Sequence, residues 1–452
     1  MRPIVRHLFT LCLALAPASV VAQQPTILHN ARLIDGTGAP AREHVDITLR
    51  NGLIEGIAPA VQGKSTGATV IDCTGKTIIP GLISAHTHVG ILQNNAEPSA
   101  TAYTVENVTA ALNQYERYGV TTILSLGLNR DLVYTLRAQQ RAGALGGATL
   151  FTAGRGIGVP NAAPGLLVAA DQIYRPATPA EARQNVGDFA THHADIVKVW
   201  VDPLHGKAPG MDPAIYAAVI DEAHKDHLRV AAHVYTLADA RQLVQDGIDV
   251  LAHSVRDQPV DSLFTKSMLQ HHTWYIPTLA LDEAFFVYAT NPEVMQTNFF
   301  RQAAGPQLLA KLQAPDYATK TLAAPQTAQS QKDAVIARQN LKTLYDAGVQ
   351  IAFGTDSGAV VGRIPGFSEH RELEDLVQTG LTPLQALAVA TGQTGQLLHT
   401  LDPTLNLGLI APGYSADLII LAADPLTDIK NTRRIAAVYH HGRVIANSAP
   451  QN

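Results

Sequence analysis

The sequence is poor in cysteine and in charge, and both shortages narrow what the protein can be. Its 452 residues include two cysteines, Cys12 and Cys73, and charged residues make up 16%. A framework of several disulfides is therefore excluded. The formal net charge of −5 offers no electrostatic basis for binding nucleic acid or an anionic membrane. Apolar residues make up 46%, enough for a sizeable buried core.

Long apolar runs are also absent after the first residues. Arg2 and Arg6 precede an almost wholly apolar stretch over residues 8–21, and small residues ending at Ala22 follow it. This pattern is typical of a secretory signal peptide over residues 1–22, and the apolar stretch is short for a membrane span. Its removal would leave Cys73 without a partner for an intrachain disulfide. We therefore expect a secreted protein, in the simplest case in a bacterial periplasm, with no membrane span after signal removal.

Short stretches of alternating polarity occur near both ends of the remaining chain. They cover residues 26–33, 44–49, 53–58, 416–421 and 435–440, and they predict antiparallel strands. Because these strands come from opposite ends, we expect residues 23–80 and 405–452 to form one small composite β-sandwich domain.

Between the ends, eight short β-branched runs alternate with segments of helical period. The predicted strands are residues 82–88, 121–126, 148–153, 196–201, 229–235, 250–255, 274–279 and 351–356. This repetition favours an α/β fold, a closed (β/α)8 TIM barrel over residues 81–404. The long connection around residues 280–341 is expected to be a partly helical insertion over the barrel mouth.

Side chains that can bind metal close several of these predicted strands. His86 and His88 end the first strand, and residues two apart in a strand point to the same face. Lys198 lies inside the apolar fourth strand, where a buried ammonium is costly. The fifth, sixth and eighth strands end at His233, His253 and Asp356. Each residue alone also fits a core or surface role, but their shared position at strand ends favours one metal site.

In this order of residues the chain resembles the binuclear branch of the amidohydrolase superfamily. The flanking motifs at residues 79–88, 380–387 and 408–418 agree, and the chain is most similar to imidazolonepropionase-like enzymes and to prolidase- and carboxypeptidase-type metallopeptidases. The resemblance implies that His86, His88 and Asp356 hold one divalent metal ion. It also implies that His233 and His253 hold a second ion, with a carboxylated Lys198 bridging the two. Zinc suits these nitrogen and oxygen ligands best, and manganese, cobalt and iron are also compatible with them.

The resemblance also implies a hydrolase that cleaves the amide bond of a small peptide or an N-acyl amino acid. Two close cations lower the pKa of a water between them, so that hydroxide is available near neutral pH. Asp356 is expected to take the proton of that water and to deliver it to the leaving amine. Tyr235 lies two residues beyond His233 and is a candidate donor to the developing oxyanion, with packing of its ring as an equal alternative.

Substrate recognition and the alternative functions stay open at this point. Five side chains in predicted loops are candidates to hold a substrate carboxylate, with a surface role as the alternative for each: Arg155, Arg175, Arg256, Arg363 and His370. The alternative activities are opening of a cyclic amide or lactone, and deamination. A non-catalytic binding barrel is a further alternative, and a homo-oligomer is compatible with the sequence.

Overall fold

The computed structural model describes residues 24–61, 67–95 and 97–445. The expected signal peptide over residues 1–22 lies outside these described residues. Within them, no helix combines the length and the apolar character that a membrane crossing requires.

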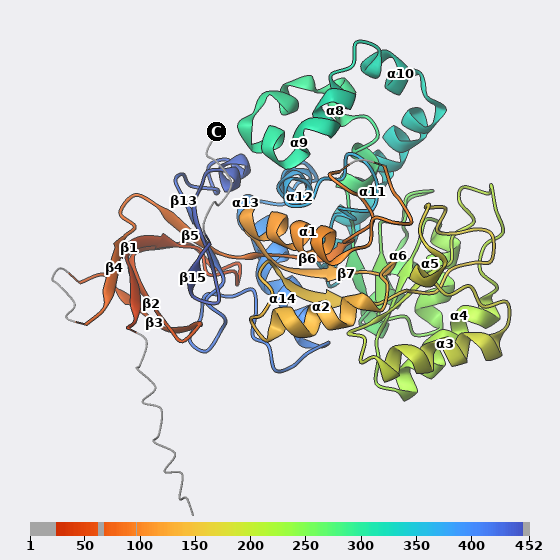
Figure 1. Ribbon diagram of the computed structural model, residues 1–452, viewed down its shortest axis with the longest axis horizontal. Helices are drawn as coiled ribbons and strands as arrows, with labels where there is room; N and C mark the ends of the chain where they lie inside the picture. The colour runs from red at the N-terminus through yellow and green to blue at the C-terminus, as the bar shows by residue number, and fades with distance from the viewer. Residues whose placement is uncertain (1–23, 62–66, 96, 446–452) are drawn as a thin grey trace, which may run out of the picture.

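Strands from both ends of the chain pair in one mixed sheet, where the first and last colours of the chain meet in Figure 1. The order is β15-β14-β13-β5-β1-β2-β3, and β4 pairs with β1. Along β2, the alternate residues Val45, Ile47 and Leu49 are buried, as a strand with one covered face requires. The bounds are β1 (Thr26–Leu33), β2 (Arg42–Arg50), β3 (Leu53–Pro59), β4 (Thr69–Asp72), β5 (Thr77–Pro80), β13 (Leu418–Leu421), β14 (Ile435–His440) and β15 (Arg443–Val444). These described strands form a single sheet, so the expected sandwich of two stacked sheets is not confirmed.

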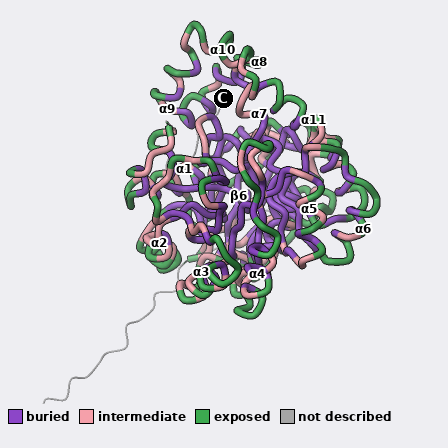
Figure 2. Tube along the Cα trace, turned by 90° about the vertical axis from the view of Figure 1, so that its right-hand side faces the viewer, coloured by how far each residue is buried: buried purple, intermediate pink, exposed green. Residues whose placement is uncertain are grey.

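The middle of the chain forms two parallel sheets with the orders β6-β7-β8 and β12-β11-β10-β9. Almost every residue of these strands is buried, because helices cover one face and the core of the molecule fills the other. Figure 2 shows these buried segments in the centre of the molecule with exposed helices around them. The bounds are β6 (Leu82–Thr87), β7 (Val120–Ser125), β8 (Thr149–Thr152), β9 (Val197–Trp200), β10 (Val230–His233), β11 (Val250–Ala252) and β12 (Trp274–Ile276). They agree with the first seven predicted strands to within a few residues.

The predicted eighth strand is not a regular strand. Ile351 makes one parallel bridge to Tyr275 of β12, but the amides of Thr355 and Asp356 both donate to the carbonyl of His86, at 3.1 and 2.8 Å. Two donors on one carbonyl are incompatible with the one-to-one pairing of a ladder. Among the described residues, regular strand pairing therefore does not close into one eight-stranded barrel, and the coarser expectation of a parallel α/β fold is what the structure shows.

Helices alternate with the parallel strands and lie around them (Figures 1 and 2). Helix α1 begins after Thr104, whose hydroxyl accepts from the amide of Asn107 at 3.2 Å, and it buries Val108, Leu112 and Tyr115. The helical segments are α1 (Val105–Arg117), α2 (Leu132–Arg141), η1 (Ala170–Gln172), α3 (Pro179–Thr191), α4 (Pro213–Lys225), α5 (Leu237–Gln245), α6 (Ser262–His271), α12 (Phe367–Gln378), α13 (Pro383–Ala388), η3 (Val389–Gln393), α14 (Thr394–His399) and η4 (Ile429–Arg433).

The long connection after β12 is helical, as expected, and runs on to Asp346. Its segments are α7 (Ala280–Glu283), α8 (Val287–Thr290), η2 (Pro292–Gln296), α9 (Asn298–Leu312), α10 (Tyr317–Ala323) and α11 (Pro325–Asp346). Figure 1 shows α8, α9 and α10 as a group projecting from the rest of the molecule. The inner part of this connection forms one wall of a cavity at the candidate site, through Leu281, Asp282, Phe285 and Gln326.

Candidate metal centre

The side chains predicted as ligands meet at the carboxyl ends of the parallel strands. His86 and His88 come from the end of β6, and their Nε2 atoms lie 3.3 and 3.0 Å from Oδ1 of Asp356. The ring of His253, just after β11, lies 4.4 Å from the ring of His86 and 4.4 Å from that of His233 at the end of β10. The structure therefore brings four histidines and Asp356 into one cluster, and His86, His88 and Asp356 form a group that can hold a metal ion.

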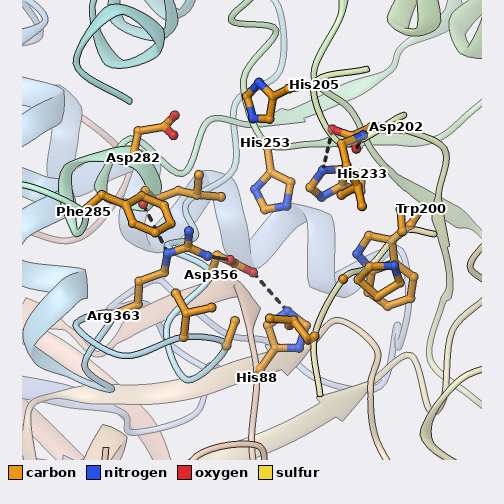
Figure 3. A pocket seen from close by; sticks show the side chains of 18 of the residues that line it. His88, Trp200, Asp202, His205, His233, His253, Asp282, Phe285, Asp356 and Arg363 are labelled. Carbon is orange, nitrogen blue, oxygen red and sulfur yellow. Dashed lines mark hydrogen bonds and ion pairs between the residues drawn. The ribbon is translucent and has the colours of Figure 1, made fainter. Parts of the chain in front are cut away.

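Three of these imidazoles are each held by the protein through one ring nitrogen. Nδ1 of His88 lies 3.1 Å from the carbonyl of Gly127, and Nδ1 of His253 lies 2.8 Å from the hydroxyl of Thr278. Nε2 of His233 lies 3.4 Å from Asp202, as Figure 3 shows. Metal-binding histidines are commonly oriented in this way, with the second nitrogen left for the ion. Sequence reasoning missed Thr278 and Asp202, because nothing in their spacing links them to a histidine.

Lys198 is fully buried on β9, and its Nζ has no hydrogen-bond partner among the described residues. The Nζ lies 5.4 Å from the centre of the Trp200 ring. Burial lowers the pKa of Lys198 to about 7. A buried ammonium without a partner is strongly unfavourable. This position therefore fits a lysine whose nitrogen is covalently bonded to a further group.

The electrostatics of the cluster favour the protonation states that metal ligands need. Burial, with Lys198 adding to it, lowers the pKa of His86 to about 3, and burial also holds the pKa of His253 well below its ordinary value. Burial opposes ionisation of Asp356, but Arg363 and the two neighbouring histidines outweigh it and hold its pKa well below the ordinary value. Neutral imidazoles and an ionised carboxylate are the forms that bind metal.

Asp356 sits in a left-handed backbone conformation, with φ of +59°, which the neighbouring hydrogen bonds hold in place. The hydroxyls of Thr355 and Ser357 each donate to Oε1 of Glu369 at 2.7 Å, and Ser84 of β6 donates to the same oxygen at 3.1 Å. Glu369 is fully buried on α12. It thus ties the loop that carries Asp356 to the strand that carries His86, a role that sequence reasoning missed because Glu369 lies in an ordinary helical segment.

A cavity of about 220 Å³ opens in front of this cluster. His88, His233, His253 and Asp356 line it, and Figure 3 shows them facing one another across it. The remaining lining is largely apolar, with four charged side chains and His205: Leu128, Ala163, Pro164, Gly165, Leu166, Trp200, Asp202, Leu204, His205, Arg256, Leu281, Asp282, Phe285, Gln326, Ala359, Val360 and Arg363. His86 and Lys198 lie behind this lining.

Two of the five predicted carboxylate-binding candidates line the cavity. Arg363 forms an ion pair with Oδ2 of Asp356, and Nε of Arg256 lies 3.2 Å from Asp282. Both arginines are buried. Buried guanidinium groups at a cavity wall can bind a planar anion, so Arg256 and Arg363 remain candidates.

The other three candidates are engaged elsewhere and do not line the cavity. Arg155 forms an ion pair with Asp131, and Arg175 donates to backbone carbonyls that include Ala163 at 3.1 Å. His370 lies 3.0 Å from the hydroxyl of Thr432 and is fully buried. The structure therefore does not place Arg155, Arg175 or His370 where they could bind a substrate carboxylate in this cavity.

Of the two roles considered for Tyr235, its contacts are those of a packed side chain. Its hydroxyl donates to Asp333 of α11 at 3.0 Å, and its ring packs on His205, with 4.2 Å between ring centres. It is not among the residues that line the cavity. The geometry therefore gives no support to Tyr235 as a donor to an oxyanion, and that role stays a prediction.

Histidines and an aspartate gather at the carboxyl ends of parallel strands, beside a buried lysine within β9. This arrangement defines the class of protein, an α/β enzyme with a candidate metal centre. The Amidohydrolase family matches residues 77–445. The chain therefore belongs to the amidohydrolase family, and it is a hydrolase acting on carbon–nitrogen bonds.

The similarity to individual known proteins extends over most of the chain in some cases and over half of it in another. It is 24% identical to enamidase from Eubacterium barkeri over 425 residues, which are 88% of this chain and 86% of that protein. It is 29% identical to ochratoxinase from Aspergillus niger over 233 residues, which are 50% of this chain and 39% of that protein. A crystal structure of a Xaa-Pro dipeptidase with bound methionine is similar, with a TM-score of 0.72 and 22% identity over 93% of this chain and 99% of that chain. At that identity the likeness shows the fold alone.

Proposed function

We propose that this chain is a binuclear metal-dependent hydrolase that cleaves the amide bond of a small peptide or an N-acyl amino acid. The observation that carries the proposal is the fully buried, unpartnered Nζ of Lys198 behind a cluster of four histidines and Asp356. Enamidase and ochratoxinase among the similar proteins support the amide class of substrate.

The proposal includes a (β/α)8 barrel over residues 81–404, with residues 23–80 and 405–452 as the terminal β domain. Isolated parallel bridges join the edges of the two parallel sheets, from Ile157 to Val199 on one side. On the other side they join Tyr275 to Ile351 and Ser357 to Thr87. These bridges support a ring of strands with irregular closure at the eighth position.

The described residues fit two metal ions. His86, His88 and Asp356 would hold one ion, His233 and His253 the second, and a Lys198 carboxylated on Nζ would bridge them. A neutral amine is the form that adds carbon dioxide, and the resulting carbamate replaces an unfavourable buried ammonium with an anion between cations. When bound, two zinc ions supply an activated water and polarise the scissile carbonyl.

In the proposal, residues of this chain transfer the protons and hold the proton-transferring group in position. Asp356 stays ionised beside Arg363. In the proposal this carboxylate accepts the proton of the attacking water and passes it to the leaving amine. Glu369 keeps the loop of Asp356 fixed through Thr355 and Ser357. Preorganised groups of this kind need no rearrangement during the reaction.

The cavity indicates the kind of substrate. Its volume of about 220 Å³ lies below the roughly 300–1,000 Å³ of sites for drug-sized ligands, which favours a small substrate. Trp200, Phe285 and Leu281 offer an apolar wall for a side chain. When Asp356 binds a metal ion, the guanidinium of Arg363 no longer needs to balance it alone and can bind the substrate carboxylate.

The test is amine release from a panel of dipeptides, N-acyl amino acids, cyclic amides and lactones, with metal-loaded enzyme and Asp356→Asn as the blank. Release from dipeptides or N-acyl amino acids that is absent in the blank would support the proposal. Opening of a lactone or a cyclic amide alone would replace it with the second candidate activity. Secretion after cleavage behind Ala22 also remains a proposal, which N-terminal sequencing of the exported protein would test.

A further inference from the structure

A second group of metal-ligand side chains lies far from the cavity, where the terminal sheet meets the parallel strands. Asp417 precedes β13, His440 ends β14, and His441 follows it in a turn. One ligand atom from each of the three side chains lies within 4.8 Å of the others. Oδ1 of Asp417 is 4.0 Å from Nε2 of His440 and 3.8 Å from Nδ1 of His441. Ligands around a zinc ion at about 2.0–2.2 Å sit slightly closer together. The rings of His440 and His441 stack with 4.2 Å between their centres and 24° between their planes, so they have to turn before a nitrogen of each faces one ion.

His440 is held as metal-binding histidines usually are. Glu116, at the end of α1, lies 2.6 Å from Nδ1 of His440 through Oε1. A carboxylate on one ring nitrogen orients the ring and raises the basicity of the other, which here is Nε2. Nε2 of His440 now lies 3.0 Å from the hydroxyl of Thr149, a neutral contact that a cation can replace.

The buried carboxylates give this group an excess of negative charge. Glu116 and Asp417 are both buried, and Oδ2 of Asp417 accepts no hydrogen bond among the described residues. Even if His440 is protonated, two carboxylates against one imidazolium leave one excess negative charge. Arg443 is exposed, lines the adjoining cavity and forms no ion pair with either carboxylate in the described part of the chain. That cavity of about 530 Å³, which Glu116, His440 and His441 also line, gives an ion access from solvent.

We propose that Asp417, His440 and His441 form a further divalent-metal site that clamps the C-terminal strands onto the parallel α/β part of the molecule. An ion there balances the charge of the Asp417 carboxylate, whose Oδ1 accepts from the amide of His441 at 2.7 Å, and joins β13 and β14 to α1 through Glu116. The site takes zinc or another ion that accepts nitrogen and oxygen ligands. It is independent of the proposed catalytic function, because none of its residues contributes to the cavity in front of Asp356.

The experiment counts zinc ions on the full chain. Metal-stripped protein is dialysed against zinc chloride, and bound zinc is measured by mass spectrometry for wild type and for His441→Asn. Asparagine tolerates the positive φ of +48° at this position. The matched control is His227→Asn, because His227 is also exposed and has φ of +59°. We expect His441→Asn to bind one zinc equivalent fewer than wild type, and the control to bind the same number as wild type.

A second arm separates this site from the proposed catalytic one. A His88→Ala, Asp356→Asn variant should lose zinc from the metal centre and retain the equivalent that His441→Asn removes. If wild type and His441→Asn bind equal amounts of zinc, the inference is wrong. If instead the His88→Ala, Asp356→Asn variant binds as much zinc as wild type, the proposed metal centre is wrong. That result does not contradict the proposed site at Asp417, His440 and His441. An anomalous zinc peak between Asp417, His440 and His441 in crystals of the zinc-loaded protein would locate the ion directly.

Discussion

The metal centre and the terminal cluster, formed by Asp417, His440 and His441, both contain histidines and an aspartate. The two groups differ in the contacts that their histidines make with the rest of the protein. At the metal centre, Nδ1 of His253 contacts Thr278 and its second ring nitrogen is left for the site. In the terminal cluster both ring nitrogens of His440 already contact protein groups, Glu116 and Thr149. His253 is therefore preorganised for an ion, whereas His440 must give up a contact before it binds one. Since rearrangement costs binding free energy, we expect the metal centre to hold zinc more tightly than the terminal cluster.

The largest effect should come from Asp356→Asn, which removes both a ligand and the proposed proton carrier. Loss of a general acid–base group alone costs about 10²–10⁴-fold in rate, so we expect at least that loss of kcat with the fold retained. Steady-state kinetics and circular dichroism on the same preparation would measure both. Turnover within tenfold of wild type would remove Asp356 from the chemistry.

Lys198→Met should separate stability from activity. Methionine has nearly the shape of lysine without the unpartnered buried nitrogen, so the metal-free variant should melt at a higher temperature than metal-free wild type. Without the bridging carbamate, activity should fall by about 100-fold or more. Thermal melts of both proteins after metal removal, together with amine release, are the measurements. An active Lys198→Met enzyme would exclude the carbamate bridge.

Arg363→Met removes the ion pair to Asp356, and its main effect should be on substrate binding. If Arg363 holds the substrate carboxylate, KM should rise about 10- to 100-fold for a dipeptide, in line with the loss of a charge-assisted hydrogen bond. The KM for the matching substrate with an amidated C-terminus should change little. Zinc content serves as the control, and an equal rise in KM for both substrates would contradict the role.

The smallest effect should come from Thr278→Val, which removes the hydroxyl that contacts Nδ1 of His253. Changes behind a ligand typically cost about 10- to 100-fold in metal affinity, and we expect the lower end of this range. Thr278→Ser keeps the hydroxyl and should behave as wild type in zinc titrations. A Thr278→Val variant with unchanged zinc affinity would show that preorganisation of His253 does not distinguish the two clusters.

The parallel strands and the candidate ligands were predictable because both follow from local pattern. Apolar runs set β6 to β12 within a few residues, and His86, His233 and His253 fall at or just after the ends of such runs. The eighth strand was predicted wrongly as regular, because the double donation to the carbonyl of His86 is a tertiary contact. No periodicity in the sequence records it.

Residue types and their positions along the chain thus determined the α/β class, the pairing of strand ends with ligand side chains, and the family of the protein. Only the tertiary structure decided which other groups reach them. Asp202, Thr278 and Glu369 contact His233, His253 and the loop of Asp356, and the hydroxyl of Tyr235 turns to Asp333. The physical reason is the separation along the chain over which each effect acts. Propensity and periodicity act between neighbours in sequence, whereas hydrogen bonds and buried charges act between groups that meet only after the chain has packed.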